Sequence, residues 1–150
     1  MSKQAEADLI LKLYELRREP VMREARGWFA TFNPKSAADF TDVLISDKSG
    51  YYRMVTSYWD MAASLVNNGA IDAQMFNDAN GEHIFVYAKL EPFLPQIRAE
   101  GNPLFLTHLE KLIKAIPNID DRLNFIRQRV QKMIELAQAR AAAKAAAADA

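Results

Sequence analysis

The chain has 150 residues, no cysteine, and 19 basic side chains that balance 19 acidic ones. The lack of cysteine excludes disulfides, thiolate catalysis and zinc fingers, and the zero formal charge gives no general attraction to nucleic acid or anionic membranes. The length is that of one ordinary domain. The amino-terminal segment lacks the apolar stretch of a signal peptide, and no apolar run approaches the roughly 20 residues of a membrane span. We therefore expect a cytoplasmic protein without a membrane span.

Apolar residues recur at intervals of three and four along most of the chain, and strict alternation is rare. This spacing predicts an all-α fold, a single-domain bundle of about six to eight helices with a long C-terminal helix. Neither an internal repeat nor a linker divides the sequence. We assign residues 1–138 to a helical bundle domain and residues 139–150 to an alanine-rich C-terminal tail, helical or frayed.

Two helices are expected to open the chain. The first covers about residues 5–18, with Leu9, Leu13 and Leu16 facing inward. The second begins at Pro20, because proline suits the first turn of a helix, and it ends before Pro34, because the residue preceding a proline avoids the helical region. Its buried stripe is expected to comprise Val21, Ala25, Trp28 and Phe32.

A short third helix, capped by Ser36, precedes a longer fourth helix over about residues 50–68, which Gly69 ends. Serine is a good N-cap and glycine a common C-terminal stop. The fourth helix is apolar over much of its circumference, so we place it at the centre of the bundle.

Prolines interrupt the helices expected in the second half of the chain. A helix over about residues 82–99 should be kinked or split near Pro92 and Pro95, because a proline inside a helix removes a hydrogen bond. Asn102 is expected to cap the next helix, with Pro103 at its first position.

The last helix is expected from about Ile119 to Ala148. Its length would be about 45 Å at 1.5 Å per residue, against about 30 Å for the remaining body, so its outer half should project. We expect this half to hold a homodimer together; the alternative is a solvated, fraying tail. The predicted seam has the four-three alternation of a coiled coil, with Ile119, Leu123, Ile126, Val130, Met133 and Ala137 as its members.

Few residues suggest chemistry. The five glycines are far apart, so no phosphate-binding loop is expected. His83 and His108 lack the spacing of metal ligands, and both are interpreted as partly exposed helical histidines. We assign no catalytic residue, no metal and no cofactor. The basic residues of the last helix follow the helix dipole and have no interleaved aromatics, so no nucleic-acid partner is expected.

The central helix carries the most unusual segment, residues 53–60, which concentrates aromatic and charged side chains. Polar groups on a buried helix need partners, and one interpretation pairs Asp60 with Arg26 or Arg98 of a neighbouring helix. The alternative is a small-molecule pocket beside this helix. Its candidate lining residues are Arg53, Tyr58, Trp59, Asp60 and Arg98.

Several short motifs resemble those of a known family. They are Arg-Gly-Trp-Phe at 26–29, Phe-Asn-Pro at 32–34, Tyr-Trp at 58–59, Asn-Gly-Ala-Ile-Asp at 68–72, and Pro-Phe-Leu at 92–94 with Arg98 and Asn-Pro at 102–103. Together they resemble a bacterial family of small all-helical domains of unknown function, found as acidobacterial-type hypothetical proteins. Some relatives carry a membrane anchor ahead of this domain, whereas this sequence opens directly on it. The resemblance implies a bacterial, helical, non-enzymatic protein and transfers no site residue.

Three hypotheses about function follow. The first is a non-enzymatic protein–protein interaction module that self-associates through its last helix. The second is a small-molecule sensor or carrier with its pocket beside the central aromatic helix. The third, which the absence of catalytic motifs disfavours, is an enzyme with an unfamiliar site.

Overall fold

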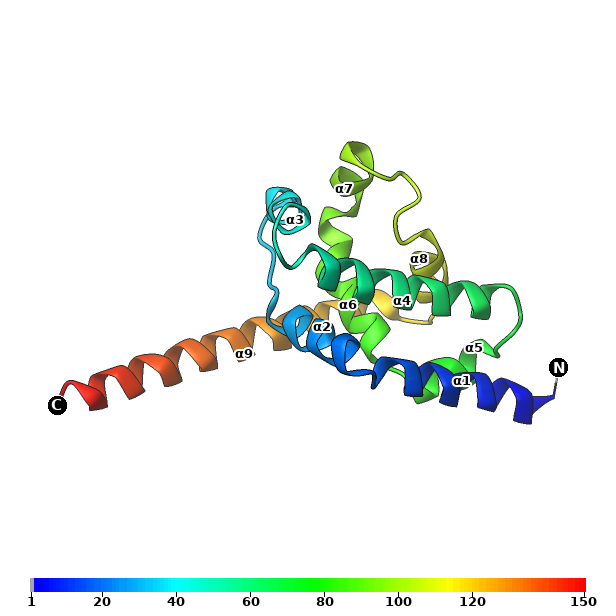
Figure 1. Cartoon of the computed structure of the whole chain (residues 1–150), viewed down its shortest axis with the longest axis horizontal. Helices are drawn as coiled ribbons and strands as arrows, with labels where there is room; N and C mark the ends of the chain where they lie inside the picture. The colour runs from blue at the N-terminus through cyan, green and yellow to red at the C-terminus, as the bar shows by residue number, and fades with distance from the viewer. Residues whose placement is uncertain (1) are drawn as a thin grey trace.

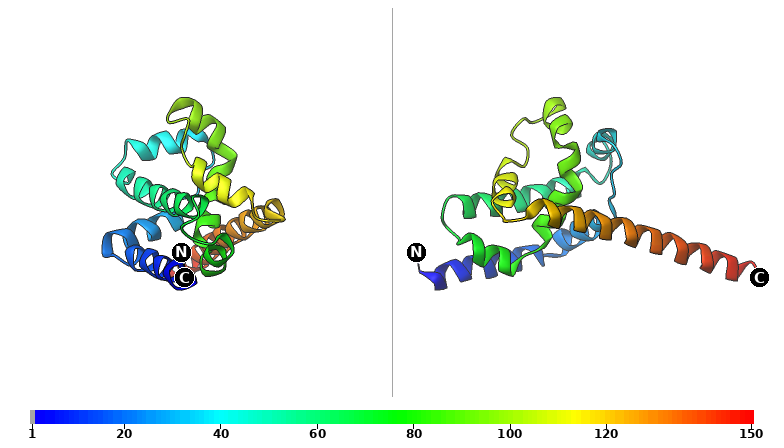
Figure 2. Two further views of the ribbon diagram at one scale, coloured as in Figure 1. Left: turned by 90° about the vertical axis from the view of Figure 1, so that its right-hand side faces the viewer. Right: turned by 180° about the vertical axis from the view of Figure 1, so that it is seen from behind.

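A computed structural model describes residues 2–150, so position 1 of the predicted body lies outside the described residues. These residues form α-helices and one short 3-10 helix, without any strand in the described range. Helices α1 to α8 make a body, and the long helix α9 leaves it on one side (Figures 1 and 2). The prediction of an all-α single domain with a long C-terminal helix is confirmed.

Two helices with side-chain caps open the body. In α1, Lys3–Arg17, the Ser2 hydroxyl accepts a hydrogen bond from an amide of the first turn. In α2, Pro20–Thr31, proline stands at the first position as expected, and the Glu19 carboxylate accepts from the backbone N–H of the third residue at 2.9 Å. Such caps satisfy amides that have no partner inside the helix.

The buried stripe of α2 differs from the prediction. Met22, Ala25 and Phe29 are buried, whereas Val21 is 47% exposed. Trp28, expected to be largely buried, is only half-buried and stacks on Phe32 at 5.1 Å between ring centroids. The aromatic pair is large enough to cover the edge of the core without entering it, so the inward face is turned by about one residue.

Helix α4, Ser49–Asn67, lies at the centre of the body, as predicted. It packs against α2, α3 (Ala37–Leu44), α5 (Ala73–Ala79) and α8 (Thr107–Lys114). Its inward face is buried and includes Tyr52, Val55, Thr56, Trp59, Ala62, Ala63 and Val66.

The proline-rich segment is divided as expected. Helix α6, Glu82–Leu90, passes into a 3-10 turn, Glu91–Phe93, and then into α7, Leu94–Glu100. Most of α6 is buried, including His83, which is 0% exposed. The expectation of a partly exposed His83 is therefore wrong, because α6 is enclosed by neighbours on nearly all sides.

The start of α8 also differs from the prediction. Asn102 does not cap a helix; its side-chain oxygen accepts from the N–H of Leu104 at 2.9 Å and makes a local turn. The chain then passes through Leu106, in the left-handed region at φ 57°, before α8 begins at Thr107. Asparagine favours such turns because its short amide competes for nearby backbone groups.

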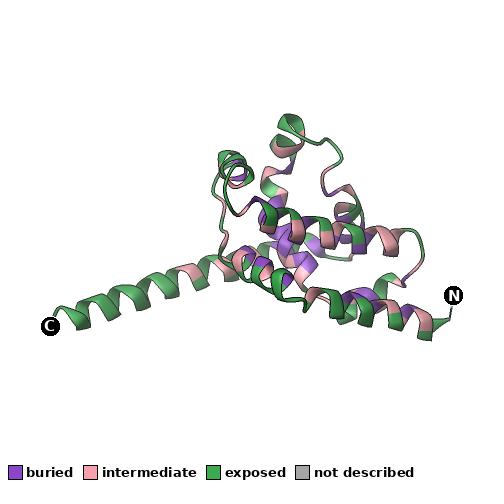
Figure 3. Ribbon diagram, in the orientation of Figure 1, coloured by how far each residue is buried: buried purple, intermediate pink, exposed green. Residues whose placement is uncertain are grey.

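Helix α9, Ile119–Ala148, is continuous over 30 residues. Ile119 and Leu123 are buried, and the helix packs against α6. Every residue from 135 onward is exposed (Figure 3). None of the helices in the described part of the chain is long and apolar enough to cross a membrane.

Candidate functional site

A groove beside α4 has a volume of about 460 Å³, within the usual range for small-molecule sites. Its walls come from α3, one face of α4, the C-terminal end of α7 and the loop that leads to α8. The lining residues are Ala37, Phe40, Thr41, Leu44, Tyr52, Arg53, Thr56, Ser57, Asp60, Ile97, Glu100, Gly101, Asn102, Leu104, Phe105 and Leu106.

Tyr52 lines this groove with a side chain that is 3% exposed. The hydroxyls of Tyr51, Tyr58 and Tyr87 donate hydrogen bonds to side-chain or backbone acceptors, but within residues 2–150 the Tyr52 hydroxyl has no such acceptor. Burial raises the pKa of Tyr52 well above its ordinary value, so its hydroxyl remains a donor at neutral pH. In the described chain, the buried side-chain atoms that lack a partner belong to Arg17, His83 and Arg98, so the Tyr52 hydroxyl keeps some contact with the open groove. From there it can donate to a bound acceptor.

Arg53 is the cation of the groove. Its guanidinium donates to the Ser49 hydroxyl at 2.8 Å, and within the described residues it forms no ion pair. The two acids that line the groove already accept internal hydrogen bonds: Asp60 from the N–H of Leu109, and Glu100 from a glutamine amide one turn earlier.

The structure separates the five candidate pocket residues. Arg53 and Asp60 line the groove. Tyr58 and Trp59 lie on another face of α4, where Trp59 is fully buried and the Tyr58 hydroxyl donates to a backbone carbonyl of α1. Arg98 does not line the groove, although the preceding residue, Ile97, does.

The expected pairing of Asp60 with an arginine is wrong. Arg26 donates to Glu82 with its shortest distance at 2.7 Å, and Arg98 binds Glu110 at 3.2 Å. Asp60 instead accepts from a first-turn amide of α8 at 2.9 Å. Within the described part of the chain, the N-cap residue of α8 makes no side-chain cap hydrogen bond, so Asp60 supplies from α4 the acceptor that this helix start requires.

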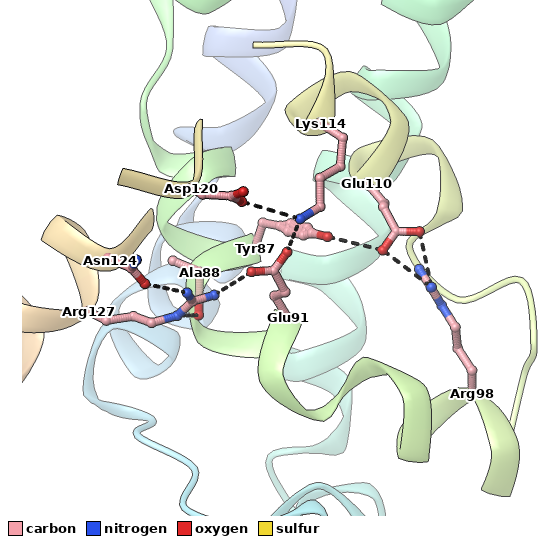
Figure 4. Close-up of polar contacts among 9 residues, drawn as sticks. All are labelled: Tyr87, Ala88, Glu91, Arg98, Glu110, Lys114, Asp120, Asn124 and Arg127. Carbon is pink, nitrogen blue, oxygen red and sulfur yellow. Dashed lines mark hydrogen bonds and ion pairs between the residues drawn. The ribbon is translucent and has the colours of Figure 1, made fainter. Parts of the chain in front are cut away.

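A second polar cluster lies where α6, α8 and α9 meet (Figure 4). Glu91 binds Lys114 at 2.5 Å and Arg127 at 2.8 Å, and Arg127 also donates to the carbonyl of Ala88. Burial, assisted by the charges of Glu91 and Glu110, raises the pKa of Tyr87, which donates to Glu110. Burial alone would raise the pKa of Glu91, but the hydrogen bonds from Lys114 and Arg127 outweigh it and lower this pKa. Since its acids and bases are paired with one another, we interpret this cluster as the anchor of α9.

His83 is buried between Trp59 and Phe76. Its Nε2 lies 2.9 Å from the side-chain oxygen of Asn77, whereas Nδ1 has no partner in the described chain. Burial, assisted by the charges of two arginines, lowers the pKa of His83 to about 3. This histidine is neutral at physiological pH, and it does not line the α4 groove.

A comparison with known families gives a match over most of the chain. The family model described as a domain of unknown function, DUF4760, matches residues 4–116. The chain belongs to the DUF4760 family. The matched segment covers α1, apart from its first residue, through α8, which leaves α9 after it. No curated protein and no solved structure matches the chain.

Sequence reasoning singled out Arg53 and Asp60 in the groove of this DUF4760 domain, but it missed Tyr52. Tyr52 fits the buried stripe of its helix, and nothing in its spacing reveals a hydroxyl without an acceptor. The signal that pointed to the groove was the pair of polar positions Arg53 and Asp60, which follow one helical stripe with Ser57. Among the residues that the structure describes, His, Asp and Glu side chains form no group able to hold a metal ion.

Proposed function

We propose that the DUF4760 domain is a binding module whose α4 groove holds a small amphipathic anion. The observation that carries this proposal is the hydroxyl of Tyr52, a groove-lining residue, which has no hydrogen-bond acceptor among residues 2–150 and keeps contact with the open groove. A ligand carboxylate would accept from this hydroxyl. This function corresponds to the sensor or carrier hypothesis.

The apolar walls favour a ligand with a hydrocarbon body. Phe40, Leu44, Leu104 and Phe105 line the groove, and Leu104 is 70% exposed. Exposed apolar side chains around a hollow are typical of a site that is covered when occupied.

The charges favour an anionic head group. Arg53 lacks a carboxylate partner within the described residues, and the oxygens of Asp60 and Glu100 are occupied in part by internal donors. A charge-assisted hydrogen bond from a guanidinium to a carboxylate is about twice as strong as a neutral one.

Binding can be tested with decanoate, a simple carboxylate with an apolar chain, by isothermal titration calorimetry on the full chain. Arg53→Gln should weaken binding about tenfold, the effect of about 1.4 kcal/mol. Tyr52→Phe removes only the hydroxyl and should weaken binding by a smaller factor.

Matched controls are available on the same chain. Arg23→Gln changes an exposed arginine of α2, and Tyr14→Phe changes a tyrosine that is 47% exposed; both variants should bind decanoate as the natural chain does. If the natural chain does not bind decanoate, or if all four variants bind equally, the proposal is wrong.

The sequence-based expectations of a bacterial origin and a cytoplasmic location stay proposals. The lack of cysteine supports a cytoplasmic location only in that no disulfide is needed. Interaction with another protein concerns a different surface, that of α9.

A further inference from the structure

The apolar stripe of α9 continues beyond the part that the body covers. Ile119 and Leu123 are buried, Ile126 is half-buried, and Met133 is 57% exposed. Beyond this point residues 135–150 are all exposed (Figure 3). A short alanine-rich helix is marginal in water by itself, so packing on its apolar stripe would stabilise the outer half of α9.

Two hollows flank the stripe where α9 leaves the body. One, of about 640 Å³, lies between α9 and the C-terminal end of α2. The other, of about 230 Å³, lies between α9 and the 3-10 turn. Residues of the stripe border both hollows, so an apolar ridge stands between two open spaces. We call Ile126, Val130, Met133 and Ala137 the α9 seam.

The α9 seam is complementary to a second α9 seam that runs in the opposite direction. Its spacing of four, three and four residues reads the same in both directions, with its midpoint between Gln131 and Lys132. An antiparallel pair of such helices therefore sets Ile126 opposite Ala137 and Val130 opposite Met133. Each layer then joins a larger side chain to a smaller one, as interdigitated helix contacts require.

The charges of α9 favour the same direction. Asp120 and Asp121 lie in its first turn, and Arg140 and Lys144 lie near its end. In an antiparallel pair the acidic turn of one helix is level with the basic stretch of the other, and the two helix dipoles oppose each other. In a parallel pair each of these charges would lie level with its own copy.

We infer that the partner of the α9 seam is a second copy of this chain. Two α9 helices cross antiparallel about a two-fold axis between Gln131 and Lys132, and each helix enters the hollow between α9 and α2 of the other copy. A two-fold pair is the commonest closed assembly. The residues that line the α4 groove do not belong to α9 and do not border the two hollows, so a failure of the dimer would not affect the proposed ligand site.

Sedimentation velocity on the full chain at tens of micromolar tests the pairing. The natural chain should run as a dimer. Met133→Glu places a charge on the seam, where burial without a partner is unfavourable, and should raise the dissociation constant at least about tenfold. Because Met133 is exposed, the variant should keep its helical circular dichroism spectrum.

Gln128→Glu is the matched control. It adds the same single charge to α9 at an exposed position outside the seam, and it should remain a dimer. A monomeric natural chain, or two variants that behave alike, would overturn the inference.

Disulfide trapping tests the direction and the register, which is straightforward in a chain without cysteine. An equimolar mixture of Ile126→Cys and Ala137→Cys chains should form a cross-linked heterodimer on oxidation. Each variant alone should not cross-link, because equal positions would be about 16 Å apart along the helices, and disulfides require Cα atoms within about 7 Å. Self-cross-linking of either variant, or no cross-linking of the mixture, would contradict the antiparallel register.

Discussion

Helices α6 and α9 pack against each other and are stabilised in opposite ways. Of the nine residues of α6, seven are buried, whereas α9 has 30 residues of which two are buried. A nine-residue segment with several β-branched and aromatic residues has little helical tendency alone. Its helix depends on tertiary burial, whereas the outer part of α9, which the body does not bury, has only the weak intrinsic preference of alanine for helix unless a partner packs on it.

The polar groups of the two helices differ in the same way. Lys89 of α6 is buried, and its ammonium donates to the carbonyls of Phe29, Ala30 and Phe32 at 2.8–3.1 Å. It thereby satisfies acceptors at and just after the C-terminal end of α2. The outer cations of α9 are all exposed. The charged group of the buried helix α6 therefore binds a neighbouring helix, whereas the outer cations of α9 face solvent.

The largest expected effect comes from a comparison of leucine-to-alanine substitutions on the two helices. Leu90→Ala on α6 should lower the free energy of unfolding by about 2–5 kcal/mol, because Leu90 is 0% exposed. Leu136→Ala on α9 should change it by less than about 0.5 kcal/mol, because Leu136 is 53% exposed. Urea unfolding at one low protein concentration measures both. Equal losses would show that α9 is part of the cooperative core.

A smaller effect is expected from the titration of His83 on α6. Its folded pKa, about 3, lies below the ordinary value of 6.5. The unfolded chain therefore binds a proton that the folded chain excludes, and stability present above pH 6.5 is lost as the pH falls. The loss should reach about 2–3 kcal/mol by a pH of about 4.5.

The contribution of His83 can be isolated by substitution. His83→Gln should be less stable at neutral pH, since the buried ring is lost, but its stability should fall less steeply between pH 6.5 and 4.5 than that of the natural chain. Urea unfolding across this range measures the two slopes. Parallel slopes would show that the imidazole does not resist protonation.

The smallest of these effects concerns how the helices begin. Helix α8 takes its acceptor from Asp60 of α4, whereas α9 carries its own acids, Asp120 and Asp121, in its first turn. Asp60→Ala should therefore cost about 1–2 kcal/mol, less than the loss of a buried ion pair would. Asp78→Ala, at an exposed position of α5, should cost almost nothing in the same thermal unfolding experiment.

The sequence by itself determined the architecture. The three-four spacing of apolar residues predicted an all-α domain, Pro20 marked the start of α2, and Pro92 and Pro95 marked the break between α6 and α7. These features depend on local backbone preferences and on periodicity, which any short window of the chain contains. The same holds for the length of α9, since no helix-breaking residue interrupts positions 119–148.

Only the tertiary structure decided which side chains meet. On the sequence alone, Asp60 could have paired with Arg26 or Arg98. In the structure those arginines bind Glu82 and Glu110, and Asp60 accepts from an amide of α8. Likewise, the burial of His83 and the unpaired hydroxyl of Tyr52 depend on what surrounds α6 and α4. Periodicity assigns a residue to a face of its helix, but its partners are set by how distant helices pack, and that information is not contained in local spacing.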